Sequence, residues 1–455
     1  MTTATATARA GFLDRIPGVG VFARLVGPAA LTAAGMIGAG AVATRLLAGA
    51  WFGFELLWVA LYVIPMVIFT LDSAARVAVV SGHRGMLDMV RTEIAAWLAW
   101  GIFLSAFAVN LIVNMSQMSA MVEGGYGALG MLPPSTPDAG IVLLTVTLTA
   151  FSVVLGVLGG YKRVEKFMTA LLIVILVSFI VVAVKGLLDW YTWGPLVRGL
   201  VPQVPDDIPV VGDSRMRSGY TQMMAIAGQA LPPTVFLTYG YLSTDAGHKP
   251  ADVRRAFWKT VQNLGLIWGV FSVVVIVAGT TALHNVYTGH GPSFLGVTHY
   301  SQIESIPVAG QVLGPAFPGA LGFLAPRFFS AGLFAAGFTT LISVALTMTY
   351  LCLDIARRDW RFTRQNRTFQ LVFGAWIAVP ALIAPFWSLP ALLKAILAMV
   401  GNLLLAPVAV AVIFYFINRR RMGEYRANGA RNVVLGVTLA FALVLAVTGV
   451  VRFFR

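Results

Sequence analysis

The sequence is poor in charge and almost free of cysteine. Only 11% of its 455 residues are charged, whereas 58% are hydrophobic. Soluble globular domains usually carry about a quarter charged residues, so this composition excludes a soluble globular protein. The single cysteine, Cys352, lies inside an apolar run. A disulfide framework and a thiolate metal site are therefore excluded, and we expect Cys352 to be a small buried hydrophobe.

Long apolar runs dominate what remains. A helix that spans a membrane needs ~20 apolar residues, and we find eleven such stretches. We expect an all-α integral membrane protein with spans 1 to 11 at residues 25–50, 53–80, 93–121, 139–160, 167–184, 220–242, 258–282, 328–353, 371–387, 390–417 and 433–451. So little chain lies outside these spans that no separate soluble domain is expected.

The net charge of +14 reflects membrane topology. Its basic residues lie in short loops between apolar runs and form no single patch or arm, so we expect a lipid bilayer and no nucleic acid as partner. With a cytoplasmic amino terminus, most of the 32 Lys and Arg residues fall on the inner side. This bias sets orientation and predicts a multi-pass protein of the cell membrane whose carboxyl terminus is extracytoplasmic.

Two spans contain residues that interrupt a helix. Span 1 contains the sequence GMIGAGAVAT and span 6 contains GQALPPTVF. The candidate substrate-binding residues at these breaks are Gly38, Ala39, Gly40 and Ala41 in span 1, and Ala230, Leu231, Pro233 and Thr234 in span 6. Unwound backbone persists in a membrane only where protein, water, substrate or ions satisfy it. Close packing at glycine and a proline kink are the alternative explanations.

The breaks stand five spans apart, so the second half of the chain runs opposite to the first. This arrangement predicts an inverted repeat with a substrate site at the membrane midplane. We expect a cytoplasmic tail at 1–24, a first repeat of helices 1 to 5 at 25–186, an extracellular loop at 187–218, a second repeat of helices 6 to 10 at 219–417, and a basic loop with helix 11 at 418–455.

Four stretches resemble the Nramp family of proton-coupled divalent-metal transporters, within the LeuT-like superfamily of amino-acid and organocation carriers. Span 1 reads GAGAVATRLLAGAWFGFELLWV, and the family pattern reads DPGNWATD…AG…FGY.LLWV. AARVAVVSG is similar to SARLGVVTG, GGYKRVEKF to G.RKLE, and FSAGLFAAGFTTLISVALTMTYL to FALGLLASGQSSTLTGTLAGQ. The resemblance implies a LeuT-like fold with an inverted 5+5 repeat plus helix 11, in which helices 1 and 6 are unwound at the midplane.

The resemblance also implies a secondary transporter that works by alternating access. No cluster of His, Asp, Glu or Ser lies at one membrane depth, so we expect no enzyme and no cofactor. No ATP-binding motif is present either. A proton or sodium gradient is therefore expected to drive transport, and we expect the protein to be a monomer.

The chain departs from the family pattern at both breaks. Metal-transporting members have Asp and Asn at the first break, where this chain has Gly38 and Ala41, and Met and His at the second, where it has Leu231 and Pro233. Without this carboxylate, the site lacks the main interaction that compensates for the free energy of removing water from a divalent ion. We therefore expect none of the usual metal ligands and favour an organic anion or amino-acid-like solute, which helix amino termini attract. The alternative is a Mn, Fe or Mg transporter with a rebuilt site.

Amides stand where the family has acids in span 3. Asn114 and Gln117 share one helix face with Asn110, so they either face the substrate or link helices by hydrogen bonds. In sodium-coupled relatives of LeuT type, a span 8 carbonyl and adjacent hydroxyls bind sodium together with span 1 carbonyls. The corresponding residues here are Ala336, Thr339 and Thr340. Hydrogen bonding between helices is the alternative role for both groups.

Arg45 stands where the family pattern has Asp. A buried guanidinium costs several kcal/mol unless it is paired, and Glu55 and Asp72 are the candidate partners. Arg45 then either holds a substrate carboxylate or belongs to a structural ion pair. Lys394, early in span 10, is expected to extend to the outer interface.

Overall fold

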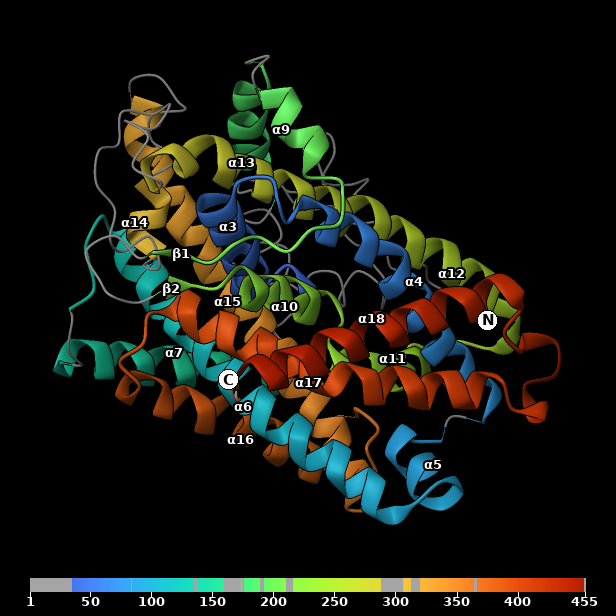
Figure 1. The fold of residues 1–455 in the computed structure, drawn as a ribbon. Coiled ribbons are helices and arrows are strands. Elements are labelled where there is room, and N and C mark those ends of the chain that lie inside the picture. Colours follow the sequence, from blue (N-terminus) through green and yellow to red (C-terminus); the bar gives the residue numbers. More distant parts are fainter. Residues whose placement is uncertain are drawn as a thin grey trace, which may run out of the picture.

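The computed structural model of the chain describes residues 35–82, 84–134, 138–158, 173, 176–188, 192–209, 216–287, 306–311, 320–363 and 366–453. This part of the chain folds into a bundle of helices, many of them long (Figure 1). Residues 25–34 of span 1 and residues 167–172, 174 and 175 of span 5 lie outside the described residues.

The helices of the first half are α3 (Ala39–Phe52), α4 (Leu57–Val80), α5 (Met86–Glu93), α6 (Ala96–Ala128), α7 (Ala139–Leu158) and α9 (Trp193–Arg198). Those of the second half are α10 (Gly219–Ala230), α11 (Pro233–Asp245), α12 (Val253–Thr260), α13 (Gly269–Tyr287), α14 (Ile306–Gln311), α15 (Ala320–Ile355), α16 (Arg367–Ile383), α17 (Ala391–Ile417) and α18 (Gly429–Phe453). Shorter turns of 3₁₀-helix are η3 (Pro250–Asp252), η6 (Ala384–Phe386) and η7 (Arg420–Tyr425), and η4 (Val261–Trp268) is a π-helix between α12 and α13.

Eight helices among the described residues are long and apolar enough to cross a membrane. The prediction of an all-helical, multi-pass membrane protein is therefore confirmed. Spans 1 and 6 do not reach this length as single helices because each is interrupted, and of span 5 only a shorter apolar helix, Leu176–Leu187, is described. The count of eleven spans stays a prediction.

Apolar side chains cover both the inside and the outside of the bundle. Large side chains such as Trp97 and Leu104 on α6, Leu143 on α7 and Leu371 on α16 are more than half exposed. Such faces are costly in water and suit lipid. Inside, glycines let backbones approach: a Cβ on Gly49 of α3 would lie 2.3 Å from the carbonyl oxygen of Ile276 on α13. Span 1 therefore packs directly on span 7.

Three features differ from the expected arrangement. A two-stranded antiparallel sheet, β1 (Ile208–Pro209) with β2 (Met216–Arg217), forms in the loop before α10. The short helix α5 precedes span 3, and α6 continues to Ala128, well past the predicted end. Helix α5 lies at one end of the bundle and α9 at the other (Figure 1). The sheet and α5 lie outside the long apolar runs, so hydropathy does not predict them.

Candidate functional site

The backbone is interrupted at both predicted breaks. Gly38 is extended, with φ −89° and ψ −179°, and α3 begins at the next residue. Helix α10 ends at Ala230, Leu231 and Pro232 are not helical, and α11 begins at Pro233. The candidates Ala39, Gly40, Ala41 and Thr234 therefore lie in first helical turns, where several backbone N–H groups have no partner within the helix.

A small cavity lined mostly by buried residues lies between the two breaks, with a volume of ≈ 50 Å³. Span 1 contributes Gly38, Gly40 and Ala41 to its wall, and the second break contributes Pro232 and Thr234. Four further helices line it through Asn110, Gln117, Gln229, Thr340, Met399 and Asn402. Ala39, Ala230, Leu231 and Pro233 are buried beside it but are not part of its lining. The structure thus brings the two breaks and one face of span 3 together.

Three amide oxygens in the cavity wall have no hydrogen-bond donor in the part of the chain that the structure describes: Oε1 of Gln117, Oε1 of Gln229 and Oδ1 of Asn402. The orientation of two amides follows from chemistry. Nε2 of Gln229 lies 2.6 Å from the carbonyl oxygen of Met36, which can only accept. Nε2 of Gln117 donates to Ser116 Oγ at 3.1 Å, and that hydroxyl donates to a backbone carbonyl. The oxygens are therefore the atoms left free.

The other polar groups of the wall also expose acceptors. Nδ2 of Asn110 donates to Ala106 O at 2.7 Å, and its Oδ1 accepts from the hydroxyl of Thr234 at 3.4 Å. Nδ2 of Asn402 faces the sulfur of Met399 at 3.7 Å. No Asp or Glu lines the cavity, and the described residues contain no group of three or more His, Cys, Asp or Glu that could hold a metal. The site is rich in neutral oxygen.

Of the two predicted amides, only one faces the cavity. Asn114 is buried, and its Nδ2 donates to the carbonyl oxygen of Trp376 on α16 at 3.0 Å. Asn114 therefore links two helices, whereas Gln117 lines the cavity. Sequence reasoning missed Gln229 and Asn402. Both are amides within apolar helices, a signal that could have drawn attention to them.

Thr340 occupies the space where a side chain on residue 38 would begin. A Cβ on Gly38 would lie 2.1 Å from Thr340 Oγ1, and this hydroxyl donates to Gly35 O at 3.2 Å. Thr339 Oγ1 donates to Ala336 O on its own helix at 3.1 Å. Spans 1 and 8 are thus joined where the sodium site was expected, and sodium binding stays a prediction.

The structure brings Arg45 to neither of its two candidate partners. Asp72 pairs with Nε of Arg76 at 2.7 Å and with Nη1 of Arg431 on α18 at 2.5 Å. Glu55 is exposed in the turn between α3 and α4, where partial burial and the nearby Asp206 raise its pKa. Asp72 has nearer cations on its own helix and on α18, and Glu55 remains at the surface. The expected ion pairs of Arg45 are wrong.

Glu123, the one acid in the sequence of α6, was also missed. Its carboxylate accepts from the amino ends of two helices, from Ala391 N at 2.7 Å and from Ile306 N at 3.1 Å. The nearby Lys394 is 3% exposed and donates to Ser119 Oγ at 2.8 Å. The expectation that Lys394 reaches the outer interface is wrong, because Ser119 and the Glu123 charge hold it inside the bundle.

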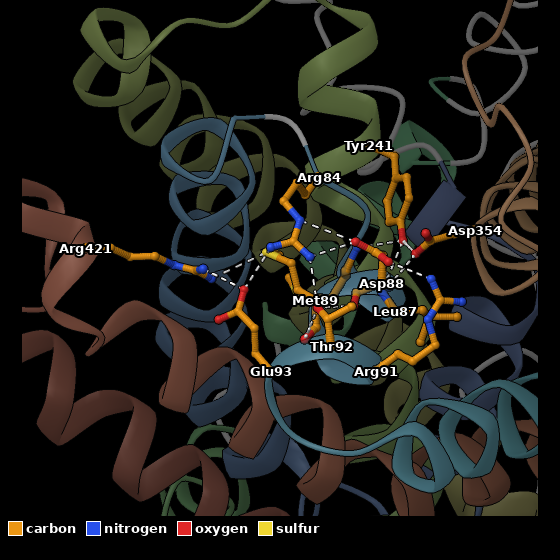
Figure 2. A network of polar contacts seen from close by, with 11 residues as sticks. Arg84, Leu87, Asp88, Met89, Arg91, Thr92, Glu93, Tyr241, Asp354 and Arg421 are labelled. Atoms are coloured by element: carbon orange, nitrogen blue, oxygen red, sulfur yellow. Dashed lines mark hydrogen bonds and ion pairs between the residues drawn. The ribbon is translucent and has the colours of Figure 1, made fainter.

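A polar network joins the far end of α11 to α5 and α15 (Figure 2). The hydroxyl of Tyr241 donates to Asp354 Oδ2 at 2.5 Å and accepts from Met86 N at 2.7 Å. Asp354 Oδ2 also accepts from Asp88 N at 3.1 Å. The predicted topology places this end of the bundle in the cytoplasm. We call the contacts among Tyr241, Asp354 and Met86 the clasp. Helix α11 therefore lines the cavity near one end and forms the clasp near the other.

A helical membrane bundle with two interrupted helices around one small cavity has the architecture of a secondary transporter. The chain belongs to the Nramp family. The family model described as natural resistance-associated macrophage protein-like matches residues 29–452. Its members are transporters and not enzymes, so the predictions of an Nramp-related transporter and of no enzyme are confirmed.

Known relatives agree with this family over most of the chain. A divalent metal cation transporter MntH of Brucella suis biovar 1 is 24% identical over 94% of this chain and 88% of its own length. The MntH of Burkholderia ambifaria is 24% identical over 70% and 68%. A crystal structure of a variant of the Eremococcus coleocola manganese transporter superposes with TM-score 0.69 at 17% identity, covering 96% of this chain and 89% of that one. This likeness shows the fold.

Proposed function

We propose that this chain carries a divalent metal cation across the cell membrane and that the cation keeps part of its water shell in the cavity. The observation that carries the proposal is the set of amide oxygens from Gln117, Gln229 and Asn402, which line one cavity and have no donor among the described residues. A buried acceptor without a partner costs free energy. A bound cation or its water ligands supply the missing partner.

The lack of an acid in the cavity wall determines how the cation is held. Complete dehydration of a divalent ion by neutral ligands is unfavourable. Carbonyl and water ligands suit Mg²⁺ and Mn²⁺, and Mg²⁺ usually keeps several waters. The cavity volume of ≈ 50 Å³ exceeds the ~15 Å³ that one water requires. An ion with a few waters therefore suits this space better than a bare soft metal.

An organic anion or amino-acid-like solute receives less support. Unpartnered acceptors face the cavity, and acceptors repel a carboxylate. The volume of ≈ 50 Å³ is also far below the ~300 Å³ of a small organic ligand pocket. The amino ends of α3 and α11 favour an anion, so the test includes such solutes. The relatives named divalent metal cation transporter support the cation.

We further propose that a proton or sodium gradient drives this transport and that the protein works as a monomer. Eleven spans in two inverted repeats, with the amino terminus in the cytoplasm and the carboxyl terminus outside, account for the two interrupted helices and for the basic loops. Alternating access follows when the helices that carry the breaks move relative to the rest of the bundle.

Uptake by the full-length chain in proteoliposomes tests the proposal. Fluorescent reporters inside the vesicles follow Mg²⁺ and Mn²⁺ under an imposed proton or sodium gradient, and mass spectrometry follows a mixture of amino acids and organic acids. We expect saturable metal uptake, and we expect Gln229→Leu to abolish it. Gln222→Leu is the matched control: Gln222 lies on the same helix and donates to Thr44 O at 2.6 Å, but it does not line the cavity. Accumulation of an organic solute without metal uptake would contradict the proposal.

A further inference from the structure

The guanidinium of Arg45 is enclosed in the membrane domain without a carboxylate. Its side chain is 0% exposed, and its Nη1 donates within α3, to Ala41 O at 3.2 Å and Thr44 Oγ1 at 3.4 Å. The ion pairs formed among the described residues do not include it. Arginine stays protonated in proteins, so a full positive charge is buried here.

The two remaining nitrogens of this guanidinium have no hydrogen-bond partner in the part of the chain that the structure describes. They are Nε and Nη2. These two atoms form one edge of the planar group, and this edge donates two parallel hydrogen bonds when arginine binds an anion side-on. The free donors of Arg45 are thus those of an anion-binding fork.

The ring of Trp268 lies against the same guanidinium and carries a second unpartnered donor. The Cζ atom of Arg45 lies 5.0 Å from the centroid of the Trp268 ring. Trp268 is also 0% exposed, and its Nε1 has no partner among the described residues. It ends the π-helix η4, and such irregular turns are frequent at functional sites. Spans 1 and 7 together therefore bury three donor nitrogens that have no acceptor among the described residues.

We propose that Arg45 and Trp268 bind a small monovalent inorganic anion of the halide class, such as chloride. One negative charge neutralises the guanidinium and accepts from Nε, Nη2 and the indole Nε1. The contact with the indole ring offsets only part of the cost of burying the charge. Because neither side chain has exposed surface, we expect the site to admit only a small anion. Binding of the halide does not depend on which solute the protein carries.

The anion site is linked to the cavity through one residue. Nη1 of Arg45 donates to the carbonyl oxygen of Ala41, and Ala41 lines the cavity. A bound halide reduces the repulsion between Arg45 and a cation one helical turn away. Metal uptake should therefore require halide, and this consequence alone rests on the proposed function.

Thermal unfolding of the purified full-length protein tests the site directly. In chloride or bromide we expect a midpoint about 3 to 5 °C higher than in gluconate of equal ionic strength. Bromide should give an anomalous density peak beside Arg45 and Trp268. Arg45→Met should remove the halide effect, and Trp268→Phe, which keeps a ring but loses the N–H, should weaken halide binding about tenfold. Arg217→Met is the control, because Arg217 lies 5.1 Å over Trp51 but is only partly buried.

An equal midpoint in halide and gluconate, together with no bromide peak, would overturn the proposal. A shift produced by formate but not by halide would overturn the assigned class of anion. If Arg45→Met does not fold, Trp268→Phe and the bromide map decide. Halide binding without metal uptake would refute the proposed function alone, whereas metal uptake without halide binding would refute this site alone.

Discussion

Tyr241 at the end of α11 donates a hydrogen bond to Asp354 at the end of α15, and Met86 N of α5 donates to the same hydroxyl. The first turn of α11 carries Thr234 into the cavity wall. Helix α11 therefore connects the cavity to the contact between Tyr241 and Asp354. If α11 moves as the proposed alternating access requires, we expect the contact between Tyr241 and Asp354 to break when the cavity opens toward this end of the bundle.

Tyr241→Phe should favour the conformation that is open at this end. The change removes the bond to Asp354 and leaves Met86 N without its acceptor, at a cost of about 1 to 3 kcal/mol. In a Cys352→Ala background, a cysteine at Thr234→Cys should react faster with an impermeant thiol reagent applied from the cytoplasm. Tyr415→Phe, on α17 outside the clasp, is the control. Equal labelling rates in the two variants would show that the clasp does not close this side.

Gln229→Glu should tighten binding of divalent cations. The substitution keeps the shape of the side chain and adds a negative charge where an amide oxygen already faces the cavity. Charge-assisted contacts are roughly twice as strong as neutral ones, so we expect at least about a tenfold lower Kd for Mn²⁺, or about 1.4 kcal/mol. Calorimetric titration of the purified protein measures this. Gln222→Glu should leave the Kd unchanged, and an equal Kd in Gln229→Glu would mean that this oxygen does not face the ion.

Glycine and proline made the breaks predictable from the sequence. A helix cannot continue through Pro232 without losing a hydrogen bond, and the glycines of GMIGAGAVAT occur at the matching position of span 1. These local signals depend on no distant contact. The fold class followed from them and from the long apolar runs.

The contents of the cavity were less predictable because they depend on packing between distant helices. Asn114 and Gln117 share a helix face, yet the carbonyl of Trp376 accepts from one, and the other lines the cavity. The sequence did not reveal that Asp72 pairs with Arg431 and not with Arg45, because Arg431 lies more than three hundred residues away. Hydropathy carries no information about such long-range choices.

Gly38→Asp should fail to restore the carboxylate typical of the family. A Cβ at this position would lie 2.1 Å from Thr340 Oγ1, so we expect a loss of stability of about 1 to 3 kcal/mol from overpacking. Gly38→Asp combined with Thr340→Ala removes the obstructing hydroxyl and should recover stability and gain affinity for Mn²⁺. Thermal unfolding and calorimetry measure the two effects. A stable Gly38→Asp single variant would refute the steric argument.

The ion pairs of Asp88 with Arg84 and Arg91 on α5 should weaken in acid. Burial raises the pKa of Asp88. Hydrogen bonds from Arg84 at 2.8 Å and Arg91 at 2.6 Å lower the pKa by more than burial raises it, so the pKa of Asp88 is below its usual value. A carboxyl group with a depressed pKa stabilises the folded state at pH values above its pKa in the unfolded state, near ~3.9. This stabilisation is lost as the pH falls toward the pKa in the folded state. Asp88→Asn should cost up to about 1 kcal/mol at pH ~6, since the pair is partly exposed. This cost should shrink as the pH falls below ~3.9 toward the folded-state pKa, and a cost that does not change with pH would contradict the assignment.

Glu123→Gln alone should destabilise the protein more than Glu123→Gln combined with Lys394→Met does. The single change leaves the ammonium of Lys394 buried without a charge to offset it, and it weakens the acceptor shared by Ala391 N and Ile306 N. Burying a charge without another charge to offset it costs several kcal/mol. Lys394→Met removes the orphaned charge and keeps an apolar side chain of similar length. Unfolding midpoints of the wild type, both single variants and the double variant form a cycle that isolates the coupling. Additive effects of the two changes would show that these side chains act independently, so that the helix amino ends alone hold Glu123 in place.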